Sequence, residues 1–269
     1  MTISTLHPKT GEPLPPAIPA ATLIIYRDAP HGHQSELLMV VRAQSMAFAG
    51  GAAVFPGGKV DDADVDFASH IIKQQSLILP TDEIAARLAA IRETLEETGL
   101  ALGIVGAHDP HQVAEARAMA HEAISFADIC AKMRWQPDIL SLTPWARWRP
   151  PLLEKRVFDT RFYLINAGNV PMEAKVDATE NKSLFWGSAE QALHMADKGE
   201  IKVIFPTRRN LERLAQFDVF DAANAHALDH PVEMVMTYID ERADGKWLCI
   251  PDGHGYPVTE EHLSSAMRG

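Results

Sequence analysis

Three glutamates stand at spacings that place their side chains on one side of a helix. Glu93, Glu96 and Glu97 occupy positions i, i+3 and i+4 within the segment RETLEETGL, residues 92–100. Like charges at this spacing cost a helix roughly a few tenths of a kcal/mol per pair, and a bound cation offsets that cost. Carboxylate oxygens are ligands that suit Mg²⁺ or Mn²⁺. The pattern therefore indicates a metal site, with a solvated acidic helix face as the alternative.

The flanking residues predict the helix that positions these carboxylates. Its opposite side carries an apolar stripe at helical spacing, formed by Ile84, Leu88, Ile91 and Leu95. Pro80 favours a helix start, and we expect Thr81 or Asp82 to be the N-cap. Gly99 suits the left-handed residue that follows many helices. The three glutamates therefore lie in the last turns of the predicted helix.

A second segment, VFPGGKV at residues 54–60, is typical of a buried strand that runs into a glycine turn, where the backbone can approach a ligand closely. Together the two segments resemble the signature of the Nudix hydrolases, G-x5-E-x7-R-E-U-x-E-E-x-G-U, in which U is aliphatic. Thr94 departs from it at an aliphatic position. The residues that match the signature are Gly58, Arg92, Glu93, Glu96, Glu97, Gly99 and Leu100.

This resemblance implies the Nudix fold, an α/β fold in which a mixed β-sheet is sandwiched between α-helices. It also implies metal-dependent hydrolysis of a diphosphate, with water attacking in line at phosphorus. A rival from another class is a catalytically silent Nudix domain that senses a ligand. The complete set of three glutamates speaks against that rival, because a sensor does not need all of them.

The resemblance also assigns roles to individual residues. Glu93, Glu96 and Glu97 would hold Mg²⁺ or Mn²⁺, with a backbone carbonyl of Gly57 or Gly58 as a further ligand. Arg92 would pair with a glutamate and orient it. The general base of this family varies, so a glutamate of the signature and Glu180, which precedes a predicted strand, are both candidates.

An insertion separates the two halves of the signature. Gly58 lies 34 positions before Arg92 instead of 14, so about twenty residues are added, and we assign residues 61–79 to this insertion and expect it to be partly helical. Counted back from Arg92, the isolated glutamate of the signature falls on Ile84. The neighbouring Glu83 faces a different direction on a helix, so we assign that role to neither residue.

A longer match narrows the resemblance. Residues 38–58 resemble the second signature of the coenzyme A diphosphatase branch, L-L-T-x-R-(S/A)-x3-R-x3-G-x3-F-P-G-G, and the interrupted box resembles the peroxisomal subfamily of that branch. Ala47 stands where a second arginine is expected, which favours another diphosphate such as a nucleotide sugar, a dinucleotide or NADH. The residues in register are Arg42, Ala43, Gly51, Phe55, Pro56, Gly57 and Gly58. The resemblance implies coenzyme A or an acyl derivative as the small-molecule substrate.

Four residues are candidates for substrate contacts: Arg42, Phe55, Arg147 and Arg161. If residues 145–149 form a strand, Trp145, Arg147 and Arg149 share one side, where a base could stack and phosphates could bind. Ordinary packing, with the arginine stems along an apolar surface, is the alternative.

Composition limits the class of protein. With 269 residues, 46% of them hydrophobic, the chain can bury a substantial core. We expect one domain over residues 20–269, with additions at 206–269, after a proline-rich arm at 1–19. A net charge of −11 disfavours non-specific binding to nucleic acid or to an anionic membrane. We expect a homodimer as the assembly.

The compartment expected from the sequence is the cytoplasm. Two cysteines give no disulfide framework. No apolar run reaches the length of a membrane helix, and neither a signal peptide nor a peroxisomal C-terminal address is evident.

Apolar patterning predicts the remaining elements. Strands are expected at residues 21–26, 36–41, 160–165 and 183–186, with a turn at 30–33. Helices are expected at 114–133, 188–198 and 206–217, and a closing strand pair at 232–239 and 246–250.

Overall fold

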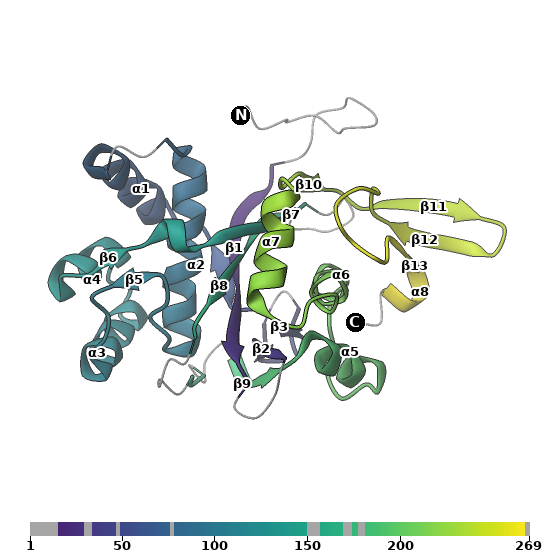
Figure 1. The fold of residues 1–269 in the computed structure, drawn as a ribbon, viewed down its shortest axis with the longest axis horizontal. Helices are drawn as coiled ribbons and strands as arrows, with labels where there is room; N and C mark the ends of the chain where they lie inside the picture. Colours follow the sequence, from purple (N-terminus) through teal and green to yellow (C-terminus); the bar gives the residue numbers. More distant parts are fainter. Residues whose placement is uncertain are drawn as a thin grey trace.

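A central mixed β-sheet organises the molecule. The computed structural model describes residues 16–29, 34–46, 49–75, 78–149, 157–168, 174–176 and 181–266. Within these residues the sheet has eight strands in the order β10-β7-β8-β1-β2-β3, with β4 paired to β1 and β9 paired to β2 (Figure 1). Helices cover both of its faces, so the predicted α/β arrangement is confirmed.

The strands of this sheet are β1 (Ile18–Asp28), β2 (Ser35–Arg42), β3 (Ala53–Val54), β4 (Gly57–Lys59), β7 (Thr143–Trp148), β8 (Phe158–Asn166), β9 (Asn181–Gly187) and β10 (Met234–Val235). β1 runs parallel to β8, and β10 runs parallel to β7. The other pairs are antiparallel. The four strands that the sequence predicts at 21–26, 36–41, 160–165 and 183–186 are confirmed.

Each face of the sheet has its own hydrophobic core. Along β1, Leu23 belongs to one core and Ile24 to the other, because successive side chains of a strand point to opposite faces. The first core contains α2 (Thr81–Thr98), around which α1 (Asp62–Gln75), α3 (Pro110–His121) and α4 (Phe126–Met133) pack. The second core contains α5 (Ala189–Asp197), α6 (Phe205–Leu214) and α7 (Phe220–Asp229).

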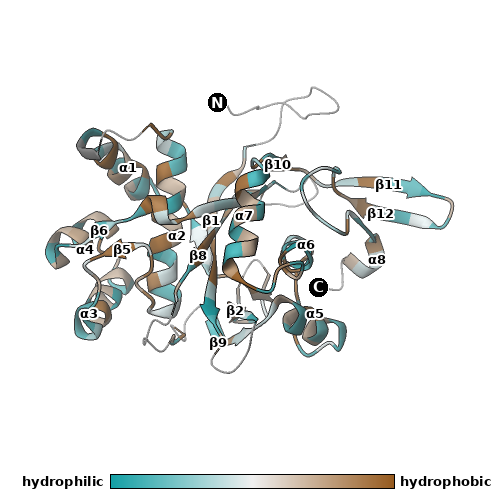
Figure 2. Cartoon of the chain, in the orientation of Figure 1, coloured by the Kyte–Doolittle hydropathy of each residue, from teal (hydrophilic) through white to brown (hydrophobic). Residues whose placement is uncertain are grey.

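Smaller elements complete the fold. β5 (Ile104–Val105) pairs with β6 (Gln136–Pro137), and a 3-10 turn, η1, spans Ile139–Ser141. A separate three-stranded sheet, β11 (Tyr238–Arg242), β12 (Gly245–Cys249) and β13 (Glu260–His262), projects from the main body and leads into α8 (Leu263–Ala266) (Figure 1). Figure 2 shows that the β11–β12 hairpin is mostly hydrophilic toward its tip.

The predicted helices agree with the structure except for one. α5 and α6 confirm the helices at 188–198 and 206–217, and α1 confirms that residues 61–79 are partly helical. The single helix expected at 114–133 is wrong, because two helices, α3 and α4, occupy this stretch. Ser125 accepts a hydrogen bond from the Asp128 amide and so caps a new helix, and Ala123 has a left-handed φ of 60°.

Four other expectations need correction or lie outside the described residues. The closing strand pair is partly wrong, since residues 234–235 join the main sheet beside β7, where Val235 is buried, and only residues 238–242 pair with β12. Pro80, rather than Thr81 or Asp82, occupies the N-cap position of α2. The turn at 30–33 and most of the arm at 1–19 lie outside the described residues.

In the parts that are described, no helix combines the length and apolarity needed to cross a lipid bilayer.

Candidate active site

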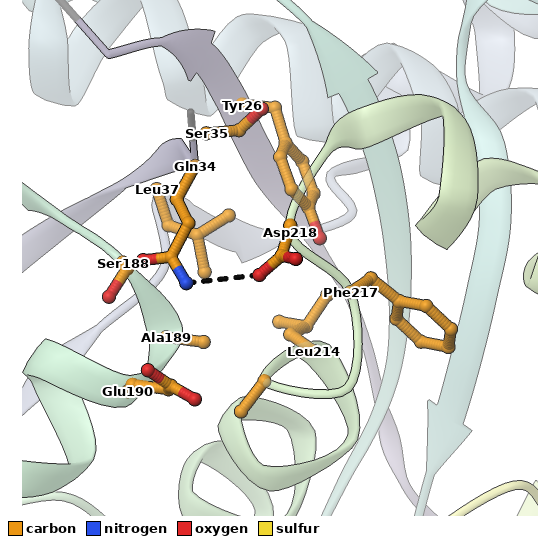
Figure 3. A pocket seen from close by; sticks show the side chains of 11 residues that line it. Tyr26, Gln34, Ser35, Leu37, Ser188, Ala189, Glu190, Leu214, Phe217 and Asp218 are labelled. Carbon is orange, nitrogen blue, oxygen red and sulfur yellow. Dashed lines mark hydrogen bonds between the residues drawn. The ribbon is translucent and has the colours of Figure 1, made fainter. Parts of the chain in front are cut away.

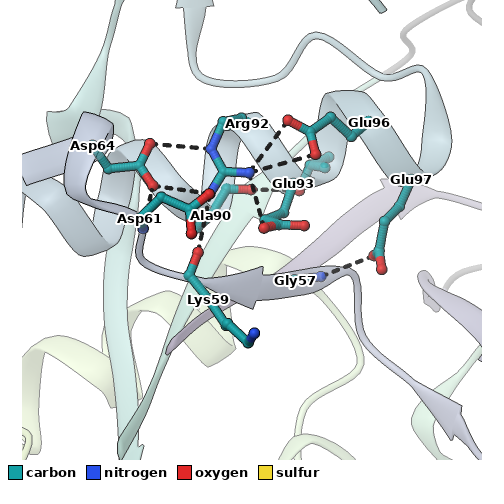
Figure 4. Close-up of polar contacts among 10 residues, drawn as sticks. Gly57, Lys59, Asp61, Asp64, Ala90, Arg92, Glu93, Glu96 and Glu97 are labelled. Carbon is teal, nitrogen blue, oxygen red and sulfur yellow. Dashed lines mark hydrogen bonds and ion pairs between the residues drawn. The ribbon is translucent and has the colours of Figure 1, made fainter. Parts of the chain in front are cut away.

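The carboxylates gather where the last turns of α2 face β4 and the start of α1 (Figure 4). The apolar side of α2 fits the first core, with Ile84, Leu88, Ile91 and Leu95 fully buried. Packing of that stripe against the sheet therefore fixes which way the polar side points. Gly99 ends the helix in the left-handed conformation that the sequence predicts, with φ of 72°, and its amide donates to the Leu95 carbonyl at 2.9 Å.

Arg92 lies at the centre of the cluster. Its Nη1 donates to Glu93 Oε1 at 2.9 Å and to Glu96 Oε1 at 3.3 Å. Its Nε and Nη2 donate to the two carboxylate oxygens of Asp64, at 3.1 and 2.9 Å. Burial alone opposes the positive charge, but the hydrogen bonds to Asp64 and the neighbouring carboxylates raise the pKa of Arg92 above its ordinary value. One buried cation thus orients three acidic side chains.

Asp64 belongs to the cluster but is not predicted by the signature counted back from Arg92. It is 2% exposed and belongs to α1, inside the stretch assigned to the insertion. Counted forward from Gly58, the isolated acidic position of the signature falls on Asp64, whereas the count back from Arg92 ends at the fully buried Ile84. Glu83 instead pairs with Arg87 at 2.9 Å. The forward count was the signal that could have identified Asp64.

Gly58 allows Glu93 to approach the backbone of β4. A Cβ atom at position 58 would lie 2.3 Å from Cδ of Glu93, which no side chain could tolerate without displacing the carboxylate. Burial raises the pKa of Glu93 to about 8, and the charges of Glu96 and Glu97 add to the rise, while Arg92 opposes it. Burial is also the main cause that raises the pKa of Glu96. Burial therefore disfavours the charged forms of Glu93 and Glu96.

The side chain of Glu97 contacts the backbone of the glycine turn. The Gly57 amide donates to Glu97 Oε2 at 3.0 Å, and Glu97 is 4% exposed. A Cβ on Gly57 would lie 2.3 Å from the Ala21 carbonyl oxygen, so the close contact of β4 with β1 requires glycine here. Thr94, which departs from the signature, is fully buried and satisfies its hydroxyl by donating to the Ala90 carbonyl at 2.8 Å.

The donor set has the chemistry that Mg²⁺ and Mn²⁺ require. Glu93, Glu96 and Glu97 supply hard oxygen atoms, and the space above Gly58 admits a carboxylate where a side chain would block it. In the described part of the chain, however, no group of three His, Cys, Asp or Glu side chains is arranged as a ready metal site. Arg92 and the Gly57 amide hold the carboxylate oxygens instead. A cation that binds Glu96 would therefore share its oxygens with Arg92.

Arg147 and Arg161 do not join the carboxylate cluster. Arg147 forms a bidentate pair with Asp159, at 2.7 and 2.6 Å, and Arg161 pairs with Asp82 in the first turn of α2. At 1.5 Å per residue, Asp82 lies about 16 Å along the helix axis from Glu93. Their charges are already balanced near the other end of α2.

The expectation that Trp145 and Arg147 share one side is also wrong. A bulge between Pro144 and Ala146 shifts the alternation of β7. Trp145 and Trp148 are consequently both buried in the second core, whereas Arg147 points to Asp159.

The two other predicted substrate contacts differ in their surroundings. Phe55 is 3% exposed and packs in the second core, on the face away from α2, so it is a core residue. Arg42 ends β2 and is partly exposed, and its buried Nε has no hydrogen-bond acceptor among the described residues. Glu180 lies outside the described residues.

Two hollows in the described surface lie away from the cluster. One, shown in Figure 3, has a volume of about 10 Å³, room for a single water, and Gln34 donates to Asp218 beside it at 3.0 Å. The other has a volume of about 440 Å³ and is lined by residues that include Trp145, Arg213 and Tyr256. Neither hollow includes a residue of the carboxylate cluster.

Comparison with known proteins identifies the family. The family model described as the NUDT19 Nudix domain matches residues 66–214, more than half of the chain. The chain belongs to this Nudix family. It is a Nudix pyrophosphohydrolase. This result confirms the resemblance and disfavours the alternative of a catalytically silent Nudix domain that senses a ligand.

The relatives span most of its length. Acyl-coenzyme A diphosphatase NUDT19 of Xenopus laevis is 25% identical over 306 residues, which cover 88% of this chain and 80% of that protein. The protein of the same name from Homo sapiens is 24% identical, with 86% and 75% covered. The crystal structure of a Nudix hydrolase from Alicyclobacillus acidocaldarius superposes with a TM-score of 0.66 at 25% identity, covering 78% of this chain and 96% of that one.

Proposed function

We propose that this Nudix enzyme hydrolyses the diphosphate of coenzyme A or of an acyl derivative, with Mg²⁺ or Mn²⁺ as cofactor. The observation that carries the proposal is the approach of Glu93 and Glu97 of α2 to the glycine turn of β4, with Glu96 held beside them by Arg92. The names of the relatives, acyl-coenzyme A diphosphatases, support the substrate class. The match of residues 38–58 to the coenzyme A signature supports it too.

The resemblance and the contacts of the cluster support a role for each residue. Bound by Glu93, Glu96 and Glu97, with a carbonyl oxygen of Gly57 or Gly58 as a further ligand, the metal would offset negative charge on the diphosphate and promote attack by water at phosphorus. Arg92 holds the carboxylates of Glu93 and Glu96 in place before substrate arrives.

Two further steps need residues of the chain. The proton of the attacking water would pass to a glutamate of the signature or to Glu180. Arg42, which matches the coenzyme A signature and is partly exposed at the end of β2, would bind a phosphate of the substrate.

A substrate panel tests the proposal. The protein is incubated with coenzyme A, ADP-ribose, NADH and a nucleotide sugar, each with Mg²⁺ and with Mn²⁺, and products are separated by mass-resolved chromatography. Metal-dependent release of 3′,5′-ADP and 4′-phosphopantetheine from coenzyme A is expected. Cleavage of another substrate, and not of coenzyme A, would overturn the substrate assignment. Ala47, which replaces an arginine of the coenzyme A signature, would agree with that result. Turnover that persists after treatment with EDTA, without added metal, would overturn the assignment of Mg²⁺ or Mn²⁺ as cofactor.

Other assignments stay predictions. We take residues 20–269 as one domain, with the insertion at 61–79 and additions at 206–269. A homodimer and a cytoplasmic location are the expected assembly and compartment. Size-exclusion chromatography with light scattering and localisation of a tagged protein would check them.

A further inference from the structure

The carboxyl end of α2 is held by an arginine from another helix. Arg117 of α3 donates from Nε to the Glu96 carbonyl and from Nη2 to the Glu97 carbonyl, both at 3.0 Å. These carbonyls belong to the last turn of α2, where backbone acceptors have no partner within the helix. The side chain of Arg117 therefore provides hydrogen-bond donors for two backbone carbonyls of the turn that carries Glu96 and Glu97.

The same guanidinium connects this turn to a distant segment. Arg117 Nη2 also donates to the Lys175 carbonyl at 2.7 Å, and the Lys175 amide donates to the Thr98 carbonyl at 2.8 Å. Segment 174–176 is thus bound to the end of α2 both directly and through Arg117. Gly99 leaves space for the guanidinium of Arg117, since a Cβ at position 99 would lie 3.1 Å from its Nη1.

The charge of Arg117 suits its place. The carboxyl end of a helix has a partial negative charge, which disfavours further carboxylates such as Glu96 and Glu97 in the last turn. A cation hydrogen-bonded to the last carbonyls offsets that cost. Without it, the turn would be free to fray, as helix ends do.

We propose that Arg117 is a positioning residue for hydrolysis, holding the Glu96–Glu97 turn of α2 and segment 174–176 in one arrangement. The inference rests on the proposed function, because it assigns Arg117 to the same site. Arg117 acts through backbone carbonyls and does not contact the substrate. Its loss should therefore lower turnover more than substrate binding.

The experiment compares Arg117→Met, Arg117→Lys and a matched control, Arg242→Met. Arg242 also donates several hydrogen bonds, to Asp240 and Glu260, but it lies in the separate small sheet. For each variant we would measure kcat and KM for the substrate that the wild type cleaves. Fold is checked by the urea midpoint, and backbone opening by hydrogen exchange in peptides that cover residues 94–100 and 174–176.

For Arg117→Met we expect kcat to fall about 10- to 100-fold with KM changed less than about threefold, since small misplacements of reacting groups cost this much. Exchange should accelerate in both peptides, and Arg117→Lys should restore part of kcat. Arg242→Met should match the wild type. Wild-type kcat in folded Arg117→Met, or unchanged exchange in both peptides, would overturn the inference. An inactive wild type would instead overturn the proposed function.

Discussion

Asp64 and Arg92 are 28 positions apart in the sequence, yet they form a bidentate ion pair with N···O distances of 3.1 and 2.9 Å. Both side chains are at least nine-tenths buried. The pair links α1, the helix in the insertion, to the helix that carries the glutamates. The insertion is therefore part of the support of the site.

Replacement of Asp64 by asparagine should destabilise the protein by roughly 1.5–3 kcal/mol, because Arg92 loses the charge of its bidentate partner and keeps only Glu93 and Glu96 as acidic partners on α2. The measurement is urea unfolding followed by circular dichroism. Asp66→Asn, an exposed position on the same helix, is the control and should change stability little. Equal stability of the two variants would show that Asp64 does not support Arg92.

Replacement of Glu97 by glutamine should nearly abolish turnover while the fold is kept. The amide retains the size of the side chain but lacks the charge that a divalent cation requires. The loss should exceed the roughly 10- to 100-fold that removal of an outer partner of a metal site costs. Steady-state kinetics at saturating Mg²⁺ or Mn²⁺ check this, with Glu190→Gln on the surface of α5 as the control. Activity retained in Glu97→Gln would remove Glu97 from the site.

Replacement of Gly58 by alanine should impair turnover more than stability. The new Cβ would meet the end of the Glu93 side chain, which can rotate away at small energetic cost. The carboxylate would then leave the position that the proposed metal site needs. A thermal midpoint close to that of the wild type with strongly reduced kcat is the expected result. Normal kcat would mean that the position of Glu93 does not matter for turnover.

His226 should titrate well below an ordinary histidine. Burial, together with the charges of Arg213 and His230, lowers its pKa to about 4. Between this value and the ordinary pKa of about 6.5, the unfolded state binds more protons than the folded state, so the free energy of unfolding falls as pH falls through this window. Histidine-detected NMR titration measures the pKa directly. A value near 6.5 for His226 would contradict the burial of its neutral form.

Local patterns predicted the carboxylate helix because its apolar stripe, its glutamates and Gly99 all lie within one continuous segment. Asp64 was missed for a different reason, since the inserted residues break the count from Arg92 and only tertiary packing brings the two together. The side chains of β7 were assigned to the wrong face because a bulge is not visible in alternating hydrophobicity.

Contacts between distant segments were the second feature that the sequence could not predict. The pairing of Arg117 with the end of α2 depends on how α3 turns back after Gly99, which no local pattern indicates. The arginines at positions 147 and 161 suggested phosphate binding by residue type, but their acidic partners lie on a neighbouring strand and on α2.

The parallel pairing of β1 with β8 sets the order in which the sheet can form during synthesis. Ile18 lies opposite Phe158, and Tyr26 lies opposite Asn166, so the two central strands are separated by about 140 residues of chain. Contacts at such sequence separation form slowly, because the intervening chain must first be brought into place. Until residue 166 has left the ribosome, one edge of β1 lacks its partner and offers unpaired backbone groups to other chains. A nascent chain shorter than this should therefore depend on chaperones to avoid aggregation.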